Sequence, residues 1–200
     1  LHLPLRRRLA ALGIGAILAL YSYGVLGSIQ FIPVALAILI FYTFPLLTSV
    51  YMWVTGRAQP TWATAAALVV AFVGLALALD VTGGHLSLAG VALAAMAALG
   101  ITAVIVLNNR VVGEGDSRPV TLHMMVSATT IFAVITWAAG DFALPSTATG
   151  WTAFALGPMA YAAAIVTIFI AMSLAGPVPT SLSMNLEPVA SMLFGFLALG

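Results

Sequence analysis

The sequence predicts an all-α integral membrane protein, built as a bundle of seven transmembrane helices. Three observations predict this class. Hydrophobic residues make up 63% of the 200 residues and charged residues only 6%, which is too few charges to cover the surface of a soluble domain. Seven apolar windows are each long enough to cross a bilayer. Two of these windows also share one pattern of prolines, which is typical of transporter folds.

The seven windows follow one another with short breaks of glycine, proline and polar residues. A bilayer core of about 30 Å needs about 20 residues per helix, and each window meets that length. The weakest break, at 29–32, contains only one polar residue, Gln30, before Pro33. Alanine and glycine recur within the windows and predict close helix contacts. The windows are 8–28, 32–54, 61–80, 86–108, 119–139, 150–173 and 178–200.

The basic residues predict the orientation of the bundle. With seven crossings, all six arginines lie on one side, which the positive-inside rule makes cytoplasmic. Trp53 and Trp62 then fall at inner helix ends, and Trp137 and Trp151 at outer ends, as expected of an interfacial belt. We therefore expect a multi-pass protein of the cell (inner) membrane with its arginine-bearing loops in the cytoplasm. Asp80, His85 and Asp141 are expected on the outer side.

The two proline-bearing windows predict an inverted repeat. Window 32–54 opens at Pro33 and contains Pro45, whereas window 178–200 follows Pro177 and contains Pro188. These four prolines are the predicted helix breaks. An odd number of crossings separates the two windows, so they run in opposite directions and suit alternating access. Completing both halves gives five helices plus five, with two helices missing before this chain and one after it.

Parts of the chain resemble EamA-type carriers of the drug/metabolite transporter superfamily. The run Leu-Glu-Pro-Val-Ala-Ser-Met-Leu-Phe-Gly-Phe-Leu-Ala-Leu-Gly at 186–200 resembles their ninth helix. The runs that begin at Phe44 and Thr61 resemble the fourth and fifth. The resemblance implies a ten-helix inverted-repeat (5+5) fold, with 1–80 as helices 3–5 of the first repeat and 81–200 as helices 6–9. It implies export of metabolites, amino acids or drugs. Arg57 stands where such carriers often have glutamate.

Glu187 is the only acid expected near the middle of the membrane. A carboxylate at that depth is costly and is a functional hypothesis by default. It could bind a cationic group or exchange a proton. It could instead be neutral and hydrogen-bond the backbone that Pro188 interrupts. The sequence leaves both interpretations open.

Six further residues are expected along a solute pathway between the two halves. Each tyrosine also suits a packing role with one satisfied hydroxyl, and the asparagine also suits an interhelical hydrogen bond. Together they predict a weakly polar pathway with an aromatic wall, suited to amphipathic or aromatic solutes. These residues are Asn185, Tyr42, Thr43, Tyr21, Tyr23 and Tyr161.

The leading functional hypothesis is therefore a secondary active transporter that exports a small organic solute. A membrane-embedded enzyme would require clustered acids or a His/Asp pair, and the five acids are scattered. A non-transporting scaffold is the third class. No cysteine is present and the histidine spacing suits no metal site, so we expect neither a metal nor a cofactor. The expected partners are a small-molecule solute and the lipid bilayer, not nucleic acid; a homodimer is compatible with this class. We expect the chain to be an internal piece of a longer protein, since it starts at Leu1 and is still apolar at Gly200.

Overall fold

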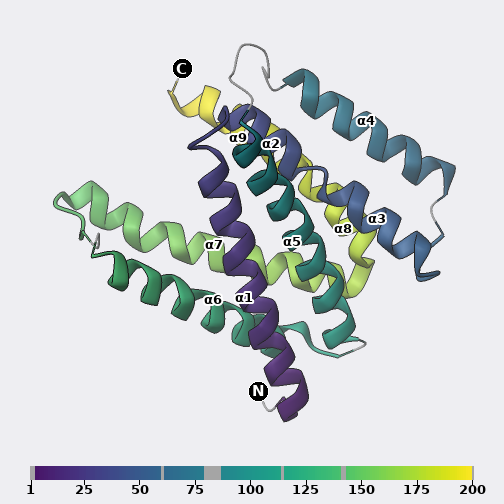
Figure 1. Ribbon diagram of the computed structural model, residues 1–200, viewed down its shortest axis with the longest axis horizontal. Coiled ribbons are helices and arrows are strands. Elements are labelled where there is room, and N and C mark those ends of the chain that lie inside the picture. Colours follow the sequence, from purple (N-terminus) through teal and green to yellow (C-terminus); the bar gives the residue numbers. More distant parts are fainter. Residues whose placement is uncertain (1–2, 60, 79–86, 114, 141–142, 200) are drawn as a thin grey trace.

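The computed structural model describes residues 3–59, 61–78, 87–113, 115–140 and 143–199. Every regular element in these ranges is an α-helix (Figure 1), which confirms the all-α class. The expected outer residues Asp80, His85 and Asp141 lie outside the described residues. The helical segments are α1 Leu5–Ser28, α2 Val34–Phe41, α3 Phe44–Val54, α4 Trp62–Ala78, α5 Leu88–Val112, α6 Ser117–Ala139, α7 Ala148–Ala175, α8 Pro177–Met184 and α9 Leu186–Leu199.

Five of the seven windows form helices that are long and apolar enough to cross a membrane. They are α1, the α2–α3 pair spanning Val34–Val54, α5, α6 and α7. In the other two windows the described helices are shorter. The helix α4 has 17 residues, and the last window is divided into α8 with 8 residues and α9 with 14. By helix length and hydropathy the chain is therefore a multi-pass helical membrane protein, and two of its windows, those of α2–α3 and α8–α9, are each divided by a short break.

The helix α1 packs closely against α5 and α6 (Figure 1). Glycines permit this contact, because a Cβ atom built on Gly15 would lie 2.3 Å from the Met124 carbonyl oxygen of α6. A Cβ atom on Gly24 would lie 3.0 Å from the Leu93 carbonyl oxygen of α5. The Ser127 hydroxyl of α6 donates a hydrogen bond of 2.8 Å to the Leu12 carbonyl. Small residues thus bring backbones together, as is usual for helices in lipid.

The main hydrophobic core lies where α2, α3 and α7 meet the unit of α1, α5 and α6. Its largest fully buried members include Ile14, Phe44, Ile105, Met124 and Met172. The alanine-rich stretch 160–164 of α7, which looked in the sequence like a helix contact, is instead exposed. Apart from Ile165, Phe169 and Met172, α7 buries little, because only its C-terminal part reaches the core.

The four prolines predicted to break helices stand at the start of helical segments, whereas Pro158 lies inside α7. Pro33 is the N-cap of α2 and Pro177 is the first residue of α8. Pro45 lies in the first turn of α3, and Pro188 in the first turn of α9. A proline is tolerated in a first turn because the N–H that it lacks would have no helical partner there. Each of the two interrupted passes is consequently an eight-residue helix, a short break and a second helix.

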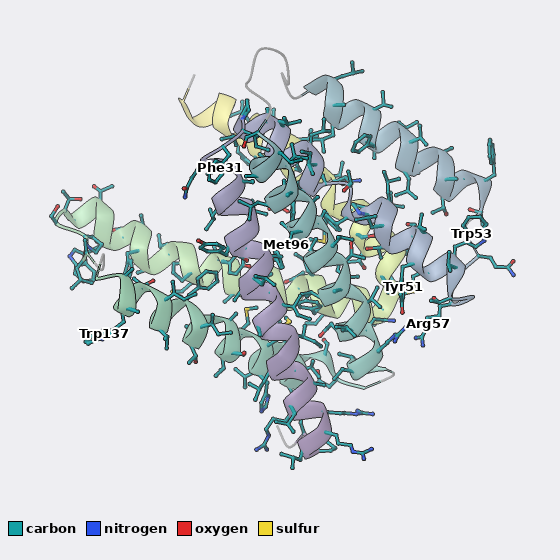
Figure 2. The ribbon with its side chains drawn as sticks, viewed as in Figure 1. Phe31, Tyr51, Trp53, Arg57, Met96 and Trp137 are labelled. Carbon is teal, nitrogen blue, oxygen red and sulfur yellow. The ribbon has the colours of Figure 1, made fainter. Side chains whose placement is uncertain are left out.

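One end of the bundle carries the arginines. Arg110, at the end of α5, donates to the hydroxyl of Tyr51 on α3, and its guanidinium lies 5.4 Å from the centre of that ring. Arg57 follows α3 at the same end (Figure 2). Arg118 forms an ion pair of 2.8 Å with Asp116, the N-cap of α6. Hydrogen bonds from the Arg118 side chain and backbone hold the pKa of the Asp116 carboxyl below its usual range.

The tryptophans lie at helix ends with their side chains exposed. Trp53 and Trp62 are 60% and 88% exposed, near the arginine-bearing end. Trp137 lies at the opposite end of the bundle (Figure 2) and is 86% exposed. Exposed tryptophans at both ends are expected of a membrane-embedded bundle, because indole favours the interface.

Candidate functional site

The two helix breaks meet in space. Tyr42, which ends α2, donates a hydrogen bond of 3.0 Å from its hydroxyl to Oε2 of Glu187 in the first turn of α9. The sequence placed both residues on the predicted pathway, and the structure brings them into direct contact. The contact joins the two interrupted passes at the point where each is broken.

A cluster of aromatic rings holds Tyr42 in place. Tyr42 is only 7% exposed, and its ring lies 5.7 Å from that of Phe44 and 5.5 Å from that of Phe41. The ring of Tyr21, from α1, stacks on Phe41 at 5.9 Å with an interplanar angle of 23°. Aromatic pairs at these separations are favourable beyond the area that they bury. The cluster therefore fixes the direction in which the Tyr42 hydroxyl points.

Tyr21 fits closely against a glycine of α5. A Cβ atom on Gly100 of α5 would lie 2.6 Å from the Cβ of Tyr21, so this glycine gives Tyr21 the space it occupies. Tyr161 of α7 is 51% exposed. Of the four tyrosines on the predicted pathway, Tyr42 is the one that hydrogen-bonds Glu187 in the described structure.

The carboxylate lies at the boundary between buried and open space. Tyr42 is buried, whereas the Glu187 side chain is exposed. A carboxylate has four lone-pair sites, and a single phenol occupies one of them. Glu187 can therefore accept a proton, or a hydrogen-bond donor of a solute, while it contacts Tyr42.

Asn185 and Thr43 have structural positions at the two breaks. The Thr43 hydroxyl donates a hydrogen bond of 2.7 Å to the Ile40 carbonyl and so supports the break after α2. The Asn185 backbone N–H donates a hydrogen bond of 3.1 Å to the Leu182 carbonyl at the end of α8. The Asn185 side chain is 8% exposed, and its Oδ1 atom has no hydrogen-bond partner among the described residues. Thr43 is thus engaged locally, whereas Asn185 offers a buried acceptor close to Glu187.

Tyr23 lies apart from the other predicted site residues. It is 57% exposed and lines a groove of about 300 Å³ between α1 and α6. Two residues separate it from Tyr21, which places the two side chains about 200° apart around the helix. Tyr23 therefore does not face Glu187. The other lining residues, all apolar, are Ala16, Ala19, Leu20, Ile131 and Ile135.

Sequence reasoning missed four residues of this region. Phe41 and Phe44 flank the break and hold Tyr42, a role that their positions beside Tyr42 and Thr43 could have indicated. Thr48 and Ser49, on α3, are buried and have hydroxyl oxygens without partners in the described structure. Two adjacent hydroxyl residues inside an apolar window are a signal that could have identified them.

The helix lengths and hydropathy define the class of this chain as a multi-pass helical membrane protein. In the described part of the chain, no three histidine, aspartate or glutamate side chains come together as metal ligands. Compared with models of known families, with curated proteins and with solved structures, the chain has no match in any of the three. Its function is therefore inferred from the carboxylate and the phenol at the two breaks.

Proposed function

We propose that this protein is a secondary active transporter that exports a small metabolite, amino acid or drug-like solute by alternating access. The hydrogen bond between Tyr42 and Glu187 carries this proposal. Interrupted helices that face each other, with an ionisable group at the break, are typical of solute sites in secondary transporters. An acidic residue inside a transmembrane segment is rare unless it serves such a site.

The similar construction of the two interrupted passes supports an inverted repeat. Pro33 and Pro177 each open a helix of eight residues, and Pro45 and Pro188 each lie in the first turn after the break. The helices α3 and α8 pack against each other, as the two halves of such a repeat would. This arrangement favours the ten-helix EamA-type fold, with 1–80 and 81–200 as parts of its two repeats.

The orientation follows from the arginine-bearing end. All six arginines lie in or beside connections at that end, so the positive-inside rule makes it cytoplasmic. Export then moves solute from this end, past Glu187, to the opposite end. The membrane is the cell (inner) membrane in this proposal.

The chemistry of the Tyr42–Glu187 pair couples charge to conformation. An ionised carboxylate only accepts hydrogen bonds, and the Tyr42 hydroxyl is its donor. Protonation makes the carboxyl group a donor as well, and a cationic solute competes with the phenol for its oxygens. Either event weakens the contact that joins the two breaks. Proton or solute binding can therefore release one half of the protein from the other.

Neither alternative class has an observation in its favour. Among the described residues, Glu187 is the only acid within a helix, so no second carboxylate joins it to hold Mg²⁺. A non-transporting scaffold would not require an exposed carboxylate hydrogen-bonded to a buried phenol.

Transport in liposomes tests the proposal. A resistance screen on cells that overproduce the protein first selects the solute from a panel of amino acids, metabolites and aromatic drugs. Counterflow of the labelled solute is then measured for the wild type, Glu187→Gln and a matched control, Tyr23→Phe, whose tyrosine lies outside the cluster. We expect Glu187→Gln to abolish counterflow or its pH dependence, and Tyr23→Phe to retain both. Full activity of Glu187→Gln with unchanged pH dependence would remove the coupling role.

A further inference from the structure

Two buried hydroxyl groups on α3 have no hydrogen-bond partner among the described residues, unlike five buried hydroxyls on other helices. Thr48 is 0% exposed and Ser49 is 6% exposed, yet neither hydroxyl oxygen has a hydrogen-bond partner among the described residues. A buried hydroxyl in a helix usually donates to a carbonyl of its own helix, three or four residues earlier. Five buried hydroxyls of this protein do so, those of Ser28, Thr102, Thr121, Thr180 and Ser181.

The packing of α3 shows which neighbour these hydroxyls face. α3 packs mainly on α5 and on α8. The side towards α5 carries Phe44, whose carbonyl accepts from Thr102, and Tyr51, which contacts Arg110. Ser49 lies about 140° around the helix from Phe44, and Thr48 about 40°. Ser49 is buried on the side away from α5 and therefore faces α8, whereas Thr48 lies between the two neighbours.

The opposing surface of α8 is also built from hydroxyl residues. The buried residues of α8 are Thr180 and Ser181. Asn185, with its unpartnered Oδ1 atom, follows α8 at the break. We use the name α3–α8 seam for the interface between Thr48 and Ser49 of α3 and Thr180 and Ser181 of α8. Asn185 lies at the end of this seam that is nearest the break. The seam runs from the break beside Glu187 to the arginine-bearing end, where α3 ends and α8 begins.

Buried polar residues without hydrogen-bond partners lower the stability of a helix interface that stays closed. Buried polar atoms almost always have hydrogen-bond partners, and an oxygen left without one lowers stability. Apolar side chains of similar size would close the same helix contact without that cost. Three oxygen atoms of the seam lack a partner among the residues that the structure describes. Water or a polar solute within the seam would supply such partners.

We infer that the α3–α8 seam is the cytoplasmic half of the solute path and becomes wet when the transporter faces inward. This inference rests on the proposed transport function and names the groups that line the path. Thr48, Ser49 and Asn185 then hydrogen-bond water or the N–H and O–H groups of a polar solute. The hydroxyls of Thr180 and Ser181 remain hydrogen-bonded to carbonyls of their own helix, and these residues form the opposing wall of the path.

The absence of cysteine from the sequence makes a direct test simple, because single-cysteine variants have no background. The test variants are Thr48→Cys, Ser49→Cys and Ser181→Cys. The buried control is Ala11→Cys, since Ala11 is 0% exposed in the half of α1 near the arginines, packed by Val112 and Val120. The exposed control is Thr55→Cys, just after α3.

Each variant is purified as a monodisperse protein to show that it folds, and is then labelled in sealed inside-out vesicles with a charged methanethiosulfonate reagent. We expect the three seam cysteines to react roughly tenfold or more faster than Ala11→Cys, and more slowly than Thr55→Cys. Rates equal to that of Ala11→Cys at all three sites would show that the seam stays dry and would overturn the inference. Labelling only from the opposite side of the membrane would overturn it as well.

Labelling also separates this inference from the proposed function, because it requires no transport. If Glu187→Gln keeps full activity while the seam is labelled, the coupling role fails and the wet seam stands. If the solute selected by the screen slows labelling of Ser49→Cys, the solute itself occupies the seam. If it leaves the rate unchanged although labelling is rapid, water alone enters the seam, and its role as part of the solute path is overturned.

Discussion

The Tyr42 hydroxyl and the Glu187 carboxylate are hydrogen-bonded at 3.0 Å although 145 residues separate them in the chain. The pair links the break of one interrupted pass to the break of the other. Because the phenol is buried and the carboxylate is exposed, the contact has one fixed partner and one accessible partner. We therefore expect a change at Glu187 to act first on Tyr42, the residue to which it is hydrogen-bonded.

Tyr42→Phe tests this link. The substitution keeps the ring and its packing but removes the donor to Glu187. A hydrogen bond to a charged group contributes about 1.5–3 kcal/mol, so we expect transport to fall by about tenfold or more and its pH profile to shift. Counterflow against pH in liposomes measures both, with Tyr23→Phe as the control. An unchanged profile would show that the phenol does not act through Glu187.

Gly15→Ala tests the close contact of α1 with α6. The added Cβ would lie 2.3 Å from the Met124 carbonyl oxygen, so the helices must move apart. Overpacking of this kind typically costs about 1–3 kcal/mol. We expect a lower midpoint of thermal unfolding in detergent.

Gly13→Ala is the matched control for that experiment. Gly13 is two residues earlier in the same helix, and a Cβ atom there would meet nothing within 4 Å. Alanine is favoured over glycine inside a helix by up to about 1 kcal/mol, so this variant should be as stable as the wild type or more stable. Equal destabilisation by both substitutions would contradict the packing argument.

Arg57 and Arg110 should be accessible from the same side of the membrane. Single cysteines at these two positions are expected to react with an impermeant reagent only in inside-out vesicles. Thr147→Cys, at the start of α7, should react only in right-side-out vesicles. Reaction of Arg57→Cys and Arg110→Cys from different sides would refute the topology, and with it the inverted repeat and the transporter proposal.

We expect the stability of the first turn of α6 to depend on pH through Asp116. Its folded-state pKa is lowered, chiefly by the hydrogen bonds from Arg118, so its stabilising contribution is present above the unfolded pKa. That contribution is lost as pH falls through the lowered folded value. Exchange of the Arg118 amide hydrogen, which is bonded to Asp116, should therefore quicken as the pH falls through that lowered value. In Asp116→Asn, which keeps a capping oxygen without the charge, this acid-dependent step should disappear.

The sequence was informative about the passes and less so about which helix faces meet. Apolar length and the placement of Pro33 and Pro177 indicated where the segments begin, because both signals are local. Tyr42 and Glu187 could be predicted to lie opposite each other because the two passes run in opposite directions. Their hydrogen bond depends on packing around Phe41 and Phe44, which a single sequence does not specify.

The separation of Tyr23 from Tyr21 shows more clearly what the sequence does not specify. Helical periodicity places the two side chains on different faces of α1. It does not say which face meets the aromatic cluster, because α1 is apolar on nearly all sides and lacks the polar stripe that orients a helix in a soluble protein. The tight fit of Tyr21 against Gly100 determines the choice, and it depends on the tertiary structure.

The shortness of α2 and α8 has a consequence for how such a protein can change over evolutionary time. Each has eight residues, about two turns, and is bounded by a proline at one end and a break at the other. The two differ in their neighbours, because α2 packs on α5, with Ala37 buried beside Ala94, whereas α8 packs mainly on α3 and α7. In the transporter proposed above, substitutions in the eight residues of α8 would therefore change the surroundings of Glu187 with less strain on the contact of α1 with α5 than substitutions in α2.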